Sequence, residues 1–306
     1  MESVSEFAFV ALMAVAFVAG FVDAIAGGGG LLAIPALLVA GLPPAATLGT
    51  GKLQALFGAG MAAITYARGG HFRWRDVGWL SLSAFAGSIG GALLAKSLPT
   101  DFLRVLLPIM LIAIATYFAL KPNLDDIDRE RRIGAAAFGL TAAPIIGFYD
   151  GVFGPGAGSF YMLAFVALAG MGVLRATAHT KLLNFASNVG GFLVFALAGV
   201  VHWRLGLAMG AMQIVGAWLG ARTAMRSGAR LIKPLLVIVC LALAARVLAD
   251  KTNPIRAWLA IQGNGGGERI RTPDTREGMP HFECGAFNHS ATPPQESTSD
   301  RLMAAR

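Results

Sequence analysis

The sequence predicts an all-α fold, a polytopic bundle of transmembrane helices, and both its composition and its spacing of apolar segments indicate this. Hydrophobic residues make up 56% of the 306 residues and charged residues 14%, against roughly 25% charged in a typical soluble domain. The mean hydropathy is +0.63. Because the chain has too little polar surface to cover a water-soluble body, we expect the lipid bilayer to surround most of it.

The apolar segments fall into two series of five. The first series covers about 7–26, 30–42, 45–67, 77–97 and 102–120, and the second covers about 133–153, 158–170, 173–198, 203–222 and 231–249. Several are near the roughly 20 residues that a helix needs to cross a bilayer. The second segment of each series is shorter and is flanked by glycine and proline, which predicts short, broken helices.

The two series also match each other residue by residue. Gly20-Phe21-Val22-Asp23 pairs with Gly147-Phe148-Tyr149-Asp150, and further along the chain Lys52 pairs with Lys181 and Trp74 with Trp203. Glycine and leucine coincide by chance in any two apolar stretches, but Asp, Lys and Trp in the same order do not. We therefore predict a first transmembrane repeat at 1–122, a cytoplasmic linker at 123–132 and a second repeat at 133–250.

The basic loop residues predict that the two halves are inverted. If the short segments cross the membrane, twelve basic residues fall on one side: Arg68, Arg73, Arg75, Lys121, Arg129, Arg131, Arg132, Arg175, Arg222, Arg226, Arg230 and Lys233. Three fall on the other: Lys96, Arg104 and Arg204. If the short segments are re-entrant, the same residues divide far more evenly. Basic loops remain in the cytoplasm, so the asymmetry favours two inverted five-segment repeats.

Glycines interrupt the chain after the first apolar segment of each half. The first break contains Gly27–Gly30, and the second contains Gly154, Gly156 and Gly158. A helix that begins there leaves its first N–H groups unpaired, and with the helix dipole these favour an anion. The alternative is that the glycines only allow close helix packing. Short, interrupted segments at matching positions of inverted halves favour a substrate site, with backbone contacts from Gly28, Gly29, Gly30, Gly156 and Gly158.

Lys52 and Lys181 are the charges that most need an explanation. Each lies inside an apolar segment, where a lysine is costly unless it faces water or a partner. They could bind a substrate, pair structurally with Asp23 and Asp150, or extend to the membrane interface. The first two roles are compatible, because an Asp–Lys pair can open for an anion.

Polar side chains beside the lysines complete the predicted site. The candidate substrate contacts are Thr50, Gln54, Thr180, Asn184 and Asn188. Such a stripe either joins helices or lines a pathway, and the sequence leaves both open. His179 is a candidate for proton coupling, together with the two aspartates, or else a hydrogen-bonding packing residue.

Several function classes lack support in the sequence. No nucleophile elbow, zinc-binding helix or phosphate loop is present, so we expect neither an enzyme nor a catalytic residue, metal site or cofactor. The basic residues are scattered between apolar stretches, which is not typical of nucleic-acid binding. A non-transporting membrane scaffold stays open, and so does homo-oligomer formation.

The ordered motifs resemble the TauE/SafE sulfite exporter family, also called the toluene sulfonate uptake permease family. The resemblance covers about residues 5–250 and is carried by Gly20–Gly30, Lys52-Leu53-Gln54, Gly147–Gly151 and Ala178–Asn184. It departs at Gly51, where a polar residue is expected. The resemblance implies a bacterial inner-membrane transporter, often an exporter, of sulfur-containing anions such as sulfite or organosulfonates. A proton-coupled importer of another small organic anion is the alternative.

Residues 251–306 do not belong to this pattern. They begin with the polar run Gly263-Asn264-Gly265-Gly266-Gly267, and we expect a disordered tail that arises from read-through of an adjoining non-coding region.

Overall fold

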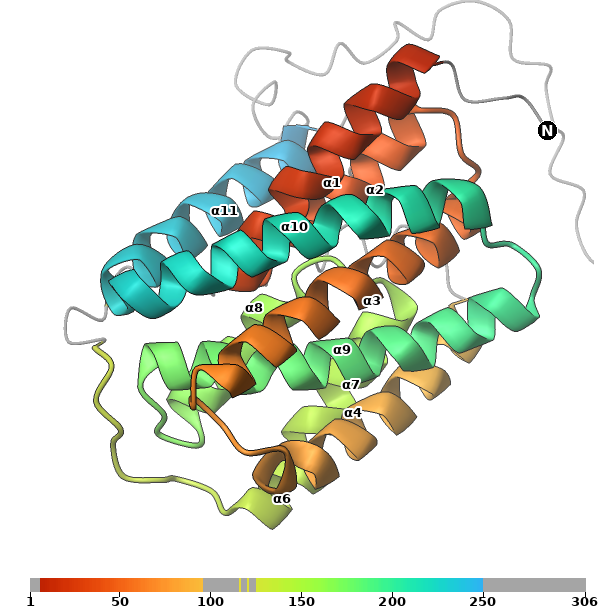
Figure 1. Ribbon diagram of the computed structural model, residues 1–306. Coiled ribbons are helices and arrows are strands. Elements are labelled where there is room, and N and C mark those ends of the chain that lie inside the picture. The colour runs from red at the N-terminus through yellow and green to blue at the C-terminus, as the bar shows by residue number, and fades with distance from the viewer. Residues whose placement is uncertain (1–5, 96–115, 117–119, 121–124, 250–306) are drawn as a thin grey trace, which may run out of the picture. The chain divides into compact units, whose positions relative to one another are not determined.

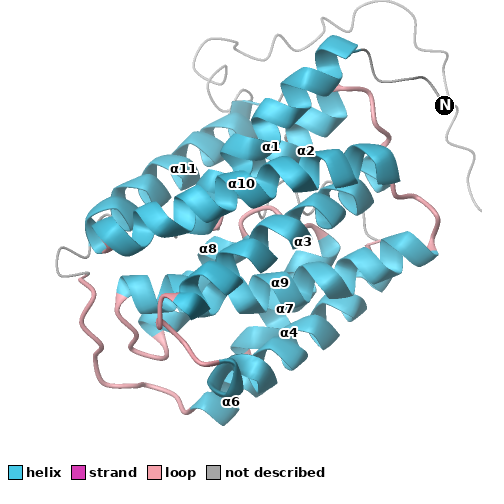
Figure 2. Ribbon diagram, viewed as in Figure 1, coloured by secondary structure: helices cyan, strands magenta, loops and turns pink. Residues whose placement is uncertain are grey.

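The structure is a computed structural model that describes residues 6–95, 116, 120 and 125–249. All regular elements within these ranges are helices (Figure 2), which confirms the all-α prediction. In chain order they are α1 (Glu6–Ala26), α2 (Gly29–Val39), α3 (Pro44–Arg68), α4 (Trp74–Leu94), α6 (Ala135–Leu140), α7 (Ala142–Val152), α8 (Ala157–Ala167), α9 (Val173–Leu197), α10 (Trp203–Ser227) and α11 (Ala229–Ala249) (Figure 1).

The chain divides into two units, Met1–Gly263 and Asn264–Arg306, and these helices all belong to the first. Most of the predicted segment at 102–120, the start of the predicted linker and the whole predicted tail lie outside the described residues.

Four described helical stretches are long and apolar enough to cross a membrane: Glu6–Ala26, Trp74–Leu94, Ala135–Val152 and Val173–Leu197. The helices α2 and α8 are apolar but have only 11 residues each, as expected for the short segment of each half. The chain is therefore a multi-pass membrane protein.

The predicted segment 133–153 is interrupted, because α6 ends at Leu140 and α7 begins at Ala142. Pro144 explains the break: it has no N–H to donate to the Leu140 carbonyl, and its ring crowds that group. The equivalent helix α1 has no proline and runs without a break.

Two equivalent helix contacts join the two halves: α1 of the first half packs on α10 of the second, and α7 of the second half packs on α4 of the first. A Cβ added to Gly216 of α10 would overlap the Phe17 carbonyl of α1, and one added to Gly87 of α4 would overlap the equivalent Pro144 carbonyl of α7. Small residues allow helix axes to approach this closely in membranes. The matching pairs agree with the predicted duplication.

The equivalent helices α3 and α9 run in opposite directions. Thr50, near the start of α3, accepts a hydrogen bond from His202 N–H just after α9. Phe72, just after α3, stacks near His179 at the start of α9, with ring centroids 5.7 Å apart. The inversion of the two halves across the bilayer stays a prediction.

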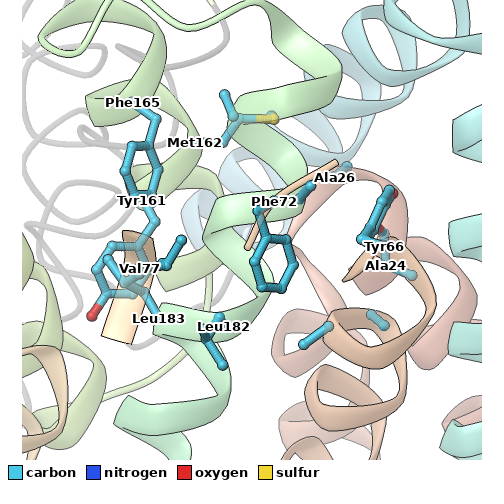
Figure 3. Packing of buried hydrophobic residues seen from close by; sticks show 14 of the residues in the cluster. Ala24, Ala26, Tyr66, Phe72, Val77, Tyr161, Met162, Phe165, Leu182 and Leu183 are labelled. Atoms are coloured by element: carbon cyan, nitrogen blue, oxygen red, sulfur yellow. The ribbon is translucent and has the colours of Figure 1, made fainter. Parts of the chain in front are cut away.

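The largest core cluster draws on both halves. Tyr66 and Phe72 of the first half belong to it together with Tyr161, Phe165 and Leu183 of the second (Figure 3). Two side-chain hydrogen bonds help hold the end of α1: Tyr66 Oη donates to Ala24 O at 2.9 Å, and Ser159 Oγ donates to Ala26 O at 2.8 Å. The first break is therefore attached to a packed core.

Candidate substrate site between the two halves

A small cavity lies where α2 and α8 begin. Its walls come from both halves: Asp23, Gly27, Gly30, Ile34, Leu48, Gly51, Lys52, Ala55, Asp150, Phe153, Gly154, Gly156, Gly158, Asn184 and Asn188. Its volume is about 30 Å³. Two larger hollows, about 540 and 600 Å³, open beside Asp125 and Arg73, away from Lys52 and Lys181. The small cavity is the candidate site because it collects both aspartates, Lys52 and the two helix starts.

Lys52 crosses from α3 to the other half. Its ammonium donates to Asp150 Oδ1 at 2.6 Å and to the Asp150 carbonyl at 2.5 Å. The second carboxylate oxygen of Asp150 accepts a hydrogen bond from the Ser187 hydroxyl. The side chains of Lys52 and Asp150 are only 5% and 2% exposed, so this pair is buried and well bonded.

Lys181 makes the reciprocal crossing from α9 to α1. Its ammonium donates to the Asp23 carbonyl, and Asp23 Oδ2 lies 3.7 Å from it. Asp23 Oδ1 accepts a hydrogen bond from Gly29 N–H at 3.1 Å. The Asp–Lys pairs anticipated from the sequence are thus present, and each connects the lysine of one half to the aspartate of the other.

The two pairs explain how the fold tolerates buried ammonium groups. Removing one partner of a buried pair is costly, about 3–5 kcal/mol, because it leaves an uncompensated charge. The net stability gained from an intact buried pair is small, since desolvation offsets most of the attraction. A stabilising role alone therefore does not account for two such pairs beside a cavity.

The two breaks touch each other at this point. Gly27 and Gly158 approach so closely that a Cβ on either would overlap the backbone of the other. Gly27 also has φ +79°, a conformation that other residues rarely adopt. The N-caps of α2 and α8 are Gly28 and Gly156, which have no side chain to bond the helix start. The predicted helix starts are thus in place.

Two amides of α9 also face the cavity. Asn188 Nδ2 donates to Asn184 O at 2.7 Å and to Asn184 Oδ1 at 3.1 Å. Both residues are buried, and as cavity walls they could orient a bound anion.

The other predicted contacts do not line the cavity. Lys181 is one of them, and it reaches the cavity only through its contacts with Asp23. Thr50 accepts from His202, and His179 Nδ1 is 2.8 Å from the Arg175 carbonyl. Gln54 Oε1 and Thr180 Oγ1 are buried without a hydrogen-bond partner among the described residues. Gly28 and Gly29 form the start of α2, but of the predicted residues in that run only Gly30 reaches the walls.

Sequence reasoning missed several wall residues. Leu48, Gly51 and Ala55 share one helix face with the predicted Lys52 by their spacing, so this pattern could have revealed them. Gly51, noted as a departure from the family pattern, leaves the wall open next to the lysine. Ile34 and Phe153 look like ordinary apolar residues, and no sequence signal distinguishes them.

Comparison with known proteins decides the family. Residues 12–247 match the family described as Sulfite exporter TauE/SafE. The chain belongs to this family. A Sinorhizobium sp relative, "Probable membrane transporter protein ORF9", is 58% identical over 248 residues, which cover 81% of this chain and 95% of that protein. "Probable membrane transporter protein YfcA" of Escherichia coli (strain K12) is 47% identical over 251 residues, covering 82% and 93%.

No solved structure shows a significant match to the chain. The family and its relatives confirm the predicted resemblance and support a membrane transporter of the TauE/SafE type.

Proposed function

We propose that this TauE/SafE family member is an inner-membrane exporter of sulfur-containing anions such as sulfite or organosulfonates, and that it works by alternating access at the cavity between α2 and α8. The observation that carries the proposal is the reciprocal crossing of Lys52 and Lys181 beside two helix starts. Ammonium groups and helix N-termini both favour anions. The sulfur chemistry and the outward direction come from the family description.

The proposed cycle begins from a closed state. In this state each lysine is bonded to the aspartate of the other half, so these contacts must open before substrate can bind the ammonium groups. An entering anion takes over hydrogen bonds that the lysines now make to Asp23 and Asp150, while the backbone starts of α2 and α8 and the amides of Asn184 and Asn188 orient it. Because each lysine connects the two halves, substrate binding weakens contacts that hold the halves together. Rocking of one half against the other then exposes the site to the other side.

A flux screen tests this function. Purified protein in proteoliposomes is given sulfite, thiosulfate, methanesulfonate or acetate, with protein-free liposomes as the control. We expect movement of the sulfur oxyanions above the control rate, and net release of sulfite from preloaded cells that express the protein. Transport of acetate alone would contradict the substrate class, and the absence of any anion flux would contradict the function.

A further inference from the structure

The two Asp–Lys pairs occupy equivalent positions in the two halves but differ in geometry. Both oxygens of the Asp150 carboxylate are bonded, one to Lys52 and one to Ser187, and its side chain is 2% exposed. The Asp23 carboxylate is 14% exposed, and its nearer oxygen is 3.7 Å from Lys181. Both aspartates line the cavity, but only Asp23 has a loose ion pair.

The sequence explains this difference. When Lys181 is aligned with Lys52, Ser187 aligns with Gly58, which has no hydroxyl to donate to Asp23. In the same alignment Asn184 and Asn188 correspond to Ala55 and Ala59. The polar stripe of α9 is therefore absent from α3, and Asp23 is left with the backbone N–H of Gly29 as its hydrogen-bond donor in the first half.

Asp23 also lies where an anion is expected. Its Oδ1 accepts the hydrogen bond of Gly29, the first residue of α2, so the carboxylate occupies the N-terminus of that helix. Among the described residues no aspartate or glutamate bonds to the start of α8; Gly156 and Gly158 border the cavity there instead. Asp23 thus competes with substrate for one of the two helix starts.

The groups that surround Asp23 come from each helix packed on α1. The nearest charge is Lys181 of α9, and Lys52 and Asp150 lie across the same cavity. Tyr66 of α3 donates to the neighbouring Ala24 carbonyl. The contacts of α2, α8 and α10 at this end of α1 come from neutral groups: the Gly29 N–H, Ser159, which bonds Ala26, and Gln213, beside Gly20. The charged side chains of α10 lie elsewhere: Arg204 is exposed at its start, Arg222 lies over the Trp218 ring, and Arg226 lines the hollow beside Asp125. The charged α11 side chains that the structure describes, Arg230 and Lys233, line the hollow beside Asp125 instead.

We propose that Asp23 is the residue that takes up a proton together with the transported anion, whereas Asp150 stays a fixed partner of Lys52. This proposal rests on the anion transport proposed above. Uptake of one proton from water converts the Asp23 carboxylate to the neutral acid. The Lys181 ammonium and the Gly29 N–H are then free for the anion, and proton and anion occupy the site together. Loss of the proton restores the carboxylate, which expels the anion.

The test is methanesulfonate binding to the purified full chain between pH 5 and 8, a range in which the charge of this probe does not change. For the wild type we expect affinity to increase at least about 5-fold as the pH falls, a typical size for coupling between two sites. Asp23→Asn removes the titrating group, so its affinity should be independent of pH. Asp150→Asn and His179→Gln should keep the pH dependence of the wild type, whatever their absolute affinities.

The melting temperature of each variant shows whether it folds. If Asp150→Asn does not fold, Ser187→Ala replaces it, because this change removes a contact of Asp150 and keeps the carboxylate. A pH dependence that survives Asp23→Asn, or that disappears in Asp150→Asn, Ser187→Ala or His179→Gln, overturns the assignment. Binding by the wild type without any pH dependence also overturns it but leaves the proposed function intact. The absence of methanesulfonate binding at every pH counts against the proposed substrate class itself.

Discussion

Lys52 and Lys181 connect the two halves through buried charge. Each ammonium starts on a helix of one half and ends on an aspartate of the other. Neither half can satisfy its own lysine in this arrangement, so separation of the halves exposes two ammonium groups and two carboxylates together. Charged pairs that join the two halves suit a carrier. Whether the lysines bond to the aspartates or to a substrate then changes together with the relative position of the halves.

Thr180 offers a test at the scale of a single hydroxyl. Its Oγ1 is buried without a hydrogen-bond partner among the described residues, a situation that costs about 1–3 kcal/mol. Thr180→Val keeps the shape and removes the unsatisfied group, so we expect a higher melting temperature in detergent.

Thr177 provides the matched control on the same helix. Its buried hydroxyl donates to the Val173 carbonyl at 2.8 Å, so Thr177→Val should lower the melting temperature. An equal loss in both variants would show that the Thr180 hydroxyl has a partner in the folded protein.

Much of the site could be predicted from residue types, and the errors have a geometric cause. Charged residues inside apolar segments are sufficient to predict that the two lysines and two aspartates belong to the candidate site. Glycines at matching breaks are sufficient to predict both helix starts. Thr50 and Gln54 were grouped with Lys52 because they are close in sequence, but residues two apart on a helix do not face the same way. The exchange of partners between halves depends on how the halves meet, which no local pattern encodes.

Glycines at the points where two helices cross determine how closely the helices pack. At Gly87 a Cβ would overlap the Pro144 carbonyl, whereas at Gly78 of the same helix it would have open space. Gly87→Ala must push α4 and α7 apart, and overpacking of this kind costs about 1–3 kcal/mol.

Gly78→Ala is the control for this prediction. This change only removes the helix propensity cost of an exposed glycine, so it should stabilise the fold by up to about 1 kcal/mol. We expect thermal unfolding in detergent to occur at a lower temperature for Gly87→Ala and at the same or a higher temperature for Gly78→Ala. Equal effects would show that α4 and α7 are not in close contact.

The described part of the linker is fastened to the start of α9. Asp128 Oδ1 accepts from Gly172 N–H at 2.8 Å, and Asp128 forms an ion pair with Arg175. Partial burial by itself raises the pKa of Asp128, but the Gly172 N–H and the Arg175 guanidinium outweigh it, so that the pKa lies below its ordinary value. A depressed carboxylate pKa means that the contact stabilises the fold above the unfolded pKa of about 3.9. The contribution is lost as the pH falls through the lower, folded value.

Asp128→Asn should therefore be less stable than the wild type at pH 7, and the difference should shrink as the pH falls below about 4. Melting temperatures measured from pH 3 to 7 check this. Glu130→Gln removes the same charge from the same linker at a side chain that forms no hydrogen bond or ion pair within the described residues, and it should match the wild type throughout. A difference between Asp128→Asn and the wild type that is as large at pH 3 as at pH 7 would contradict the titration of Asp128.

At the scale of the whole molecule, the nine apolar segments other than 102–120 and their order could be predicted, because apolar length and glycine breaks are local properties. The break at Thr141 was missed although Pro144 marks it. Which helices contact each other could not be predicted. A glycine at a helix contact looks the same in the sequence whichever helix it packs against.

The part of the chain beyond the family match gives a further prediction. The match ends at residue 247, and we expect deletion of 251–306 to leave anion flux and melting temperature unchanged. Flux per reconstituted protein, compared between the full chain and residues 1–250, measures this. A loss of flux with an unchanged melting temperature would assign the tail a role in transport.

The most direct test of the account is sulfite flux through proteoliposomes that contain Lys52→Ala or Lys181→Ala. Each change removes a charged donor from the site, and we expect flux to fall at least about tenfold, the effect of losing one charge-assisted hydrogen bond. The double variant Lys181→Met with Asp23→Asn removes both charges of one pair and leaves neither buried alone; it should fold at the wild-type melting temperature and still lose flux. Wild-type flux in both single lysine variants would contradict the claim that the crossed lysines carry the anion.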